Sequence, residues 1–133
     1  MNALSQTLPA STPRPAAASD AGVLSKAVVR VARLLGLTQR DVAAALGISE
    51  ATTSRLFASK YLLSPDHAKE WELALLLVRL FRSLDALWGH EESARLWLTS
   101  HNIALGGRPQ DLLRSVEGMV RVVAYLDAAR GRL

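Results

Sequence analysis

The chain has 133 residues, half of them hydrophobic, and a formal net charge of +4. This length is enough for one domain or two small ones, and the apolar content is enough for a buried core. The lack of cysteine excludes disulfides, thiolate metal sites and cysteine nucleophiles, and it suits a reducing cytoplasm. The longest apolar run, Leu73 to Val78, is far shorter than the roughly 18 residues that a membrane span requires. We therefore expect a soluble, cytoplasmic protein with no membrane partner.

The positive charge is concentrated in the N-terminal half of the chain. Residues 21–63 hold six basic and two acidic side chains, whereas residues 64–105 hold four basic and six acidic ones. A local positive field favours an anionic partner such as nucleic acid. A solvated basic surface would give the same count, so the charge alone leaves both interpretations open.

The pattern along the chain predicts an all-α fold with a disordered start. Residues 1–20 carry three of the five prolines and no apolar periodicity, which predicts a disordered tail. From Ser25 onward apolar residues recur at helical spacing, with Ser25 as a predicted cap and Gly36 as a predicted stop. No alternating run indicates a strand. We predict one domain over residues 21–63 and a second helical domain over residues 64–133.

The second domain is predicted to begin with a long helix that is apolar on nearly all sides. Ser64 is its predicted cap, and Pro65 stands at the first helical position, where a missing N–H costs nothing. Leu77 belongs to one apolar face and Leu75 to another, so the helix must be covered on two sides. The region from Pro65 to Trp88 is therefore a candidate for a dimer interface or for the central core.

Residues 38–57 have the spacing of two short capped helices joined by a tight turn. Thr38 with Asp41 predicts a capping box, Gly47 predicts a turn with positive φ, and Ser49 predicts the next cap. Together with Ala43, Ile48 and Leu56, these spacings resemble the repressor-type helix-turn-helix family, although Thr53 stands where that family usually has Val or Ile. An ordinary helical hairpin would carry similar caps and glycines.

The resemblance to helix-turn-helix proteins implies that the second helix enters a DNA major groove. Gln39 would then help to clamp a phosphate, and Arg55 would be the natural reader of guanine because its fork matches O6 and N7 together. Such proteins usually dimerise across a palindromic operator, so we expect a homodimer. The implied DNA-binding residues are Gln39, Arg40, Ser49, Glu50, Thr52, Ser54, Arg55 and Lys60.

The stretch from His101 to Leu113 interrupts the helical pattern with two glycines and a proline. Asn102 tolerates a left-handed backbone and can bond to its own loop, Leu105 is a candidate core residue, and Pro109 can start the next helix. A purely structural turn explains these residues. Arg108 differs, because we expect it to point outward with no local need for its charge. In the helix that follows, Glu117 and Arg121 are expected to form an ion pair.

An ordered set of residues surrounds this interruption: Gly89, Ala94, Trp97, Leu98, Asn102, Ala104 to Gly107, Pro109, Asp111 to Leu113, Gly118, Val122, Leu126 and Gly131. This set resembles the toxin-binding domain of the Xre/MbcA/ParS antitoxin family. The resemblance implies a RES-type toxin as partner, which consumes or uses NAD. It also implies that the antitoxin excludes the nucleotide by placing its C-terminal segment at the active-site mouth, with Arg108 as a further candidate contact. The implied blocking residues are Arg130, Gly131, Arg132 and Leu133.

Two functions follow from these patterns, and an enzyme is not one of them. The first is a type II antitoxin that neutralises a RES toxin and represses its own operon by binding operator DNA. The alternative is a stand-alone dimeric transcriptional regulator with no toxin partner. His67, His90 and His101 lie on separate segments without metal-ligand spacing, and no phosphate loop or nucleophile elbow occurs, so no catalytic residue, metal or cofactor is predicted.

Overall fold

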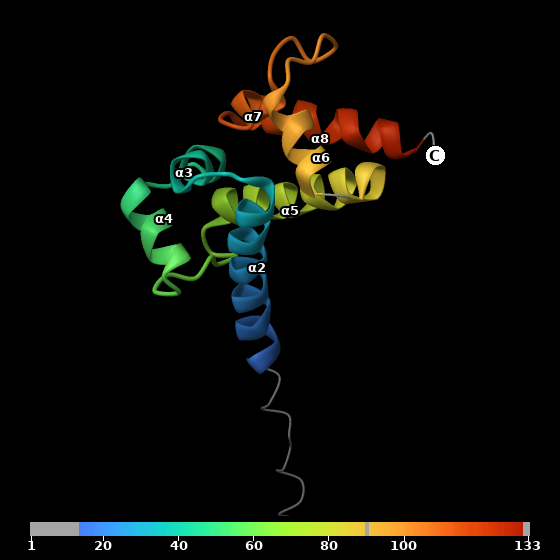
Figure 1. The fold of residues 1–133 in the computed structure, drawn as a ribbon. Coiled ribbons are helices and arrows are strands. Elements are labelled where there is room, and N and C mark those ends of the chain that lie inside the picture. The colour runs from blue at the N-terminus through green and yellow to red at the C-terminus, as the bar shows by residue number, and fades with distance from the viewer. Residues whose placement is uncertain (1–13, 90, 132–133) are drawn as a thin grey trace, which may run out of the picture.

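The computed structural model describes residues 14–89 and 91–131, and within these ranges the chain is all-α. Its helices alternate with short turns, and no strand is present in the described ranges, where Asn102 and Gly107 form one isolated bridge. Figure 1 shows the arrangement. The helices are α2 (Arg14–Leu35), α3 (Gln39–Leu46), α4 (Glu50–Phe57), α5 (Ala68–Trp88), α6 (Glu91–Thr99), α7 (Pro109–Leu112) and α8 (Val116–Arg130).

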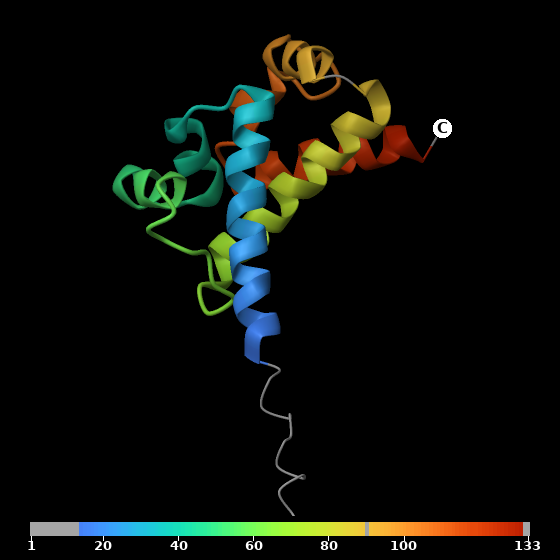
Figure 2. The same cartoon turned by 60° about the horizontal axis from the view of Figure 1, so that its bottom comes forward.

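The central element is α5, which joins the two halves of the molecule. It packs against α2 and α3 from the first half and against α6 and α8 from the second. Figures 1 and 2 show α2 and α8 on different sides of α5. The leucine face of α5 is fully enclosed, with Leu77, Leu80 and Leu84 all at 0 % exposure, because two helices cover it. This face is central core within one chain, whereas Leu75 on another face stays 48 % exposed.

The first described helix starts earlier than the sequence predicted. α2 begins at Arg14, so residues 14–20 of the predicted disordered tail are helical, while residues 1–13 lie outside the described residues. Ser25 is not a cap but lies inside α2, buried. Its hydroxyl donates to the Ala21 carbonyl at 2.7 Å and accepts from the Leu63 amide at 2.9 Å. A serine that satisfies the amide of a distant buried segment has the same local signature as a cap.

The start of α5 also differs from the prediction. The helix begins at Ala68, with His67 at the N-cap position, and not at Pro65. The Ser64 hydroxyl accepts the Asp66 amide at 3.1 Å, and the Ser64 carbonyl accepts the His67 amide at 3.0 Å. Serine bonds of this local kind compete with helix formation, and proline is as well suited to a turn as to a first helical position. The segment therefore forms a turn.

The C-terminal helices are attached to the body through aromatic packing and one arginine. Trp97 of α6 packs between Trp88 of α5 and Tyr125 of α8, with ring centroids 5.6 Å and 6.0 Å apart. On the other side of α6, Arg95 donates from Nε to the Leu34 carbonyl at 2.7 Å, which satisfies a free carbonyl near the end of α2. None of the described helices combines the length and hydropathy needed to cross a membrane.

Candidate DNA-binding and partner-binding surfaces

The pair α3 and α4 forms the predicted helix-turn-helix, and its caps are confirmed. The Thr38 hydroxyl accepts the Asp41 amide at 3.0 Å, while the Asp41 carboxylate accepts the Thr38 amide at 2.9 Å. Gly47 ends α3 with φ of 70°, and the Ser49 hydroxyl accepts the Thr52 amide to begin α4. These contacts fix the angle between two helices of only eight residues each.

Thr53, which departs from the helix-turn-helix pattern, is accommodated inside the motif. Its side chain is fully buried, and its hydroxyl donates to the Ser49 carbonyl at 2.9 Å. Threonine is nearly isosteric with valine, and this backbone bond removes the cost of burying its hydroxyl. The substitution therefore leaves the helix-turn-helix geometry intact.

Most of the predicted DNA-binding side chains are exposed on one part of this unit. Glu50, Ser54 and Arg55 are exposed along α4, and Gln39 and Arg40 are exposed on the first turn of α3. Such an exposed face is what a recognition helix needs to reach base edges.

Two of the predicted DNA contacts differ from the others. The Thr52 hydroxyl is occupied, because it accepts from Ser49 Oγ at 2.9 Å and from Arg55 Nη2 at 3.2 Å. Lys60 follows the C-terminal end of α4, where Ser59 adopts a φ of 62° and the Lys60 amide donates to the Arg55 carbonyl. The eight residues of α4 lie between Ser49 and Lys60 and correspond to a rise of roughly 12 Å, so these two predicted contacts lie at opposite ends of the helix.

Sequence reasoning missed that the second half of the chain touches the helix-turn-helix. Asp41, which caps α3, also accepts from Arg114 at 3.3 Å and from Gln110 at 3.4 Å. Arg114 and Arg40 line a shallow cleft of about 340 Å³ beside the start of α4. The contacts span 69 and 73 residues of sequence, and no local pattern carries such a signal.

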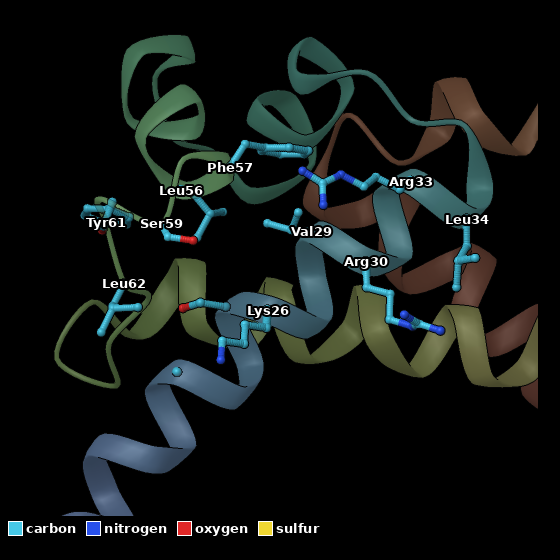
Figure 3. A pocket seen from close by; sticks show the side chains of 12 residues that line it. Lys26, Val29, Arg30, Arg33, Leu34, Leu56, Phe57, Ser59, Tyr61 and Leu62 are labelled. Carbon is cyan, nitrogen blue, oxygen red and sulfur yellow. The ribbon is translucent and has the colours of Figure 1, made fainter.

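A second groove lies between α2 and the end of α4 with the segment that follows it, and Figure 3 shows its lining. Its volume is about 350 Å³. Lys26, Arg30 and Arg33 contribute positive charge from α2, and the Arg33 guanidinium lies 6.0 Å from the centroid of the Phe57 ring. The described lining holds no histidine or carboxylate side chain that could act as a general acid or base. The groove extends the basic surface of the helix-turn-helix half.

Tyr61 at the rim of this groove is held by α5. Its hydroxyl donates to the Glu70 carboxylate and lies 3.5 Å from His67 Nδ1. Partial burial, and next the bond to Glu70, raise the pKa of Tyr61 to about 12. The phenol therefore stays protonated as a donor at neutral pH, and it ties the loop after α4 to the first turn of α5.

The interruption after α6 is a closed, hydrogen-bonded loop. The Asn102 amide donates to the Gly107 carbonyl at 2.9 Å, and the Asn102 side chain accepts the Leu105 amide at 2.9 Å. The left-handed residue is Gly106, with φ of 79°, and not Asn102. Leu105 is buried as predicted. Arg121, expected to pair with Glu117, instead donates to the carbonyl of Leu105, a loop residue outside any helix, at 3.0 Å.

Arg108 has the local role that the sequence did not reveal. Its Nε and Nη2 atoms lie 3.1 Å from the two carboxylate oxygens of Asp111, so the pair is bidentate. The bond lowers the pKa of Asp111. Asp111 lies in the first turn of α7, where a negative charge is favoured, so Arg108 completes a local charge arrangement. The expectation that Arg108 has no local need for its charge is wrong.

The predicted blocking segment is only partly described. Arg130 ends α8 and donates from Nη1 to the Ser83 hydroxyl at 3.2 Å, and Gly131 follows it. Ser83 is buried on α5 and also donates to Asp127 at 3.3 Å, a residue that pairs with Arg79. Arg132 and Leu133 lie outside the described residues. The last turn of α8 is thus anchored to the central helix.

The fold and these surfaces define a class of protein, an all-helical regulator in which a helix-turn-helix shares its core with a second helical domain. Comparison with protein families gives two matches. Residues 14–79 match the antitoxin Xre-like helix-turn-helix domain, and residues 83–132 match the antitoxin Xre/MbcA/ParS C-terminal toxin-binding domain. The chain belongs to the Xre/MbcA/ParS family of type II antitoxins, and it combines a DNA-binding domain with a toxin-binding domain.

The comparisons agree with the resemblance seen in the sequence and add a boundary. The two matches meet between residues 79 and 83, inside α5, whereas the sequence suggested a boundary at residue 63. No individual protein of curated function matches the chain. Neither matched family is a family of enzymes. Among the described residues, no group of three or more His, Asp or Glu side chains is placed to hold a metal ion; His90 lies outside them.

Proposed function

We propose that this chain binds and neutralises a RES-type, NAD-consuming toxin, and that as a homodimer it binds operator DNA to repress its own operon. The observation that carries the proposal is the joining of both family domains through one core, with α5 common to them. A stand-alone regulator would have no use for a toxin-binding domain. A single helix-turn-helix reads few base pairs, which favours a dimer on a palindromic site.

The DNA-binding half of the proposal rests on the exposed face of α4. Arg55 is exposed there, and the hydrogen bond of its guanidinium among the described residues is the 3.2 Å bond to Thr52. Its guanidinium can leave that contact at little cost and present its fork to a guanine edge. We infer that Gln39 and Arg40, at the positive N-terminal end of α3, contact a phosphate of the DNA backbone.

Arg55→Ala is expected to weaken binding to the DNA upstream of the chain's own coding sequence by about 1–3 kcal/mol. The loss should exceed the loss on random DNA, because a base contact is removed as well as a charge. Fluorescence anisotropy at fixed salt measures both affinities. Arg82→Ala is the matched control, since it removes an exposed arginine of α5, outside α3, α4 and the lining of the basic groove. Equal losses on both DNAs would reduce Arg55 to a phosphate contact.

The toxin-binding half rests on the matched C-terminal domain and on the position of the end of α8. Arg130 and Gly131 lie at the end of a helix that α5 holds firmly through Ser83 and Arg79. A helix held in this way presents the residues after it in a fixed direction. We infer that Arg130, Gly131, Arg132 and Leu133 enter the toxin's active-site mouth and exclude the nucleotide, with Arg108 near the contact.

Deleting residues 130–133 is expected to abolish neutralisation of the co-expressed RES-type toxin of the same operon while operator binding stays intact. The deletion also removes the Arg130–Ser83 hydrogen bond, so Ser83→Ala serves as the control, because it breaks the same bond and keeps the segment. Cell survival on toxin induction is the measurement. Survival with the truncated chain would rule out occlusion by this segment. Failure of the full-length chain to protect the cells would favour the stand-alone regulator.

A further inference from the structure

The loop between α6 and α7 carries an isoleucine that the fold does not use. Ile103 is 90 % exposed, more than any other large hydrophobic side chain among the described residues. Figure 1 shows that this loop projects beyond the helices of the C-terminal half. A polar residue would suit such a turn at least as well, since turn chemistry here is supplied by Asn102 and Gly106.

The backbone beneath Ile103 is fixed. The Gly106 amide donates to the Asn102 carbonyl at 2.9 Å, and the Asn102 side chain accepts the Leu105 amide. These hydrogen bonds close the loop on both sides of Ile103 and hold its backbone in place. Leu105, two residues on, is buried at 5 % exposure and its carbonyl accepts from Arg121 of α8. An exposed side chain on a backbone that is already ordered loses little entropy when it is buried by a partner.

Arg108, the other candidate contact in this loop, already forms an ion pair. Arg108 is paired in bidentate fashion with Asp111, so binding a partner's carboxylate would first break two hydrogen bonds. Ile103 has no such competing contact. Leu96, on the outward side of α6 and 67 % exposed, is a second exposed aliphatic side chain in the same domain. The apolar side chains, and not the arginine, are therefore the groups with surface to gain.

We propose that Ile103 is the anchor residue of the toxin interface and inserts into an apolar pocket on the toxin. This inference rests on the proposed function for the identity of the partner. The toxin is the expected partner because the loop lies inside residues 83–132, the segment that matches the toxin-binding domain. A preordered aliphatic side chain at a projecting tip is the geometry of a residue that fills a pocket at the centre of an interface. This contact is in addition to the one proposed for the C-terminal segment.

Ile103→Ser is expected to raise the Kd for the purified RES-type toxin of the same operon by roughly thirtyfold, the size typical of an interface anchor. Ile103→Val, which keeps most of the apolar surface, should stay close to the wild type. Val23→Ser is the matched control, since Val23 is 63 % exposed on α2, outside the toxin-binding domain, and should leave the Kd unchanged. Isothermal titration calorimetry measures the Kd, and operator binding and thermal unfolding should be unaltered in all three variants.

Three other results of these measurements would each contradict a different part of the proposal. If wild-type chain binds no toxin, the proposed function fails and the inference falls with it. If the wild type binds and Ile103→Ser binds equally well, the anchor is wrong while the toxin partner stands. If Ile103→Ser lowers the oligomeric state of the free chain in analytical ultracentrifugation, the loop contacts a second copy of the chain, and the assignment to the toxin is overturned.

Discussion

Gly118→Ala is expected to lower the free energy of unfolding by about 3 kcal/mol, although alanine is the better helix former. Gly118 lies in the first turn of α8, where its amide donates to the Ser115 hydroxyl. A Cβ at this position would stand 1.9 Å from the Leu112 carbonyl oxygen and 2.8 Å from the Leu112 carbonyl carbon. Backbone atoms cannot rotate away as a side chain can, so α7 and α8 would have to separate.

The comparison that isolates this effect is Gly107→Ala in the neighbouring loop. No heavy atom outside its chain neighbours lies within 4 Å of a Cβ at Gly107, and its φ is not positive, so the change should stay within about 0.5 kcal/mol. Urea unfolding followed by circular dichroism measures both variants. A Gly118→Ala chain as stable as the wild type would show that α7 can move off α8 freely. That result would also contradict a fixed direction for α8.

Local signals in the sequence predicted the helix-turn-helix well because its geometry is set by its own residues. Thr38, Asp41, Gly47 and Ser49 each bond within four residues, and the structure confirms all of them. The same kind of signal failed at Ser25 and Ser64, since a serine hydroxyl that bonds to a distant amide or closes a turn has the composition of a cap. The local sequence shows which side chains can donate or accept a hydrogen bond, but the tertiary structure determines which group each of them bonds to.

The candidate site was predictable only where exposure follows from helical periodicity. The outward face of α4 was found in this way, and Arg55 and Ser54 are indeed exposed. The pairing of Arg108 with Asp111 was within reach, because the two residues are three apart and α7 begins between them. The contact of Arg114 with Asp41 and the exposure of Ile103 were not, since both depend on how α7 and its loop are packed against α3 and α8.

Leu80→Ala is expected to lower the free energy of unfolding by about 3–5 kcal/mol, the cost of a cavity in a packed core. Leu80 lies midway along α5 at 0 % exposure, at the junction of the two family matches. Because α2 and α3 pack on one part of α5 and α8 on another, a cavity here removes support from both domains. We therefore expect one shared unfolding transition at lower denaturant concentration, and not the loss of one domain alone.

Two probes distinguish a shared core from two independent ones. Trp88 and Trp97 lie in the C-terminal aromatic stack, so tryptophan fluorescence is weighted toward that half, whereas far-ultraviolet circular dichroism follows all helices. Coincident curves in wild type and in Leu80→Ala are expected, since the domains share α5. Leu75→Ala, the same change at a position on α5 that is 48 % exposed, should cost less than about 1 kcal/mol. Separate transitions for the two probes would mean that the DNA-binding and toxin-binding domains fold independently. The boundary between two independently folding units would then have to lie outside α5.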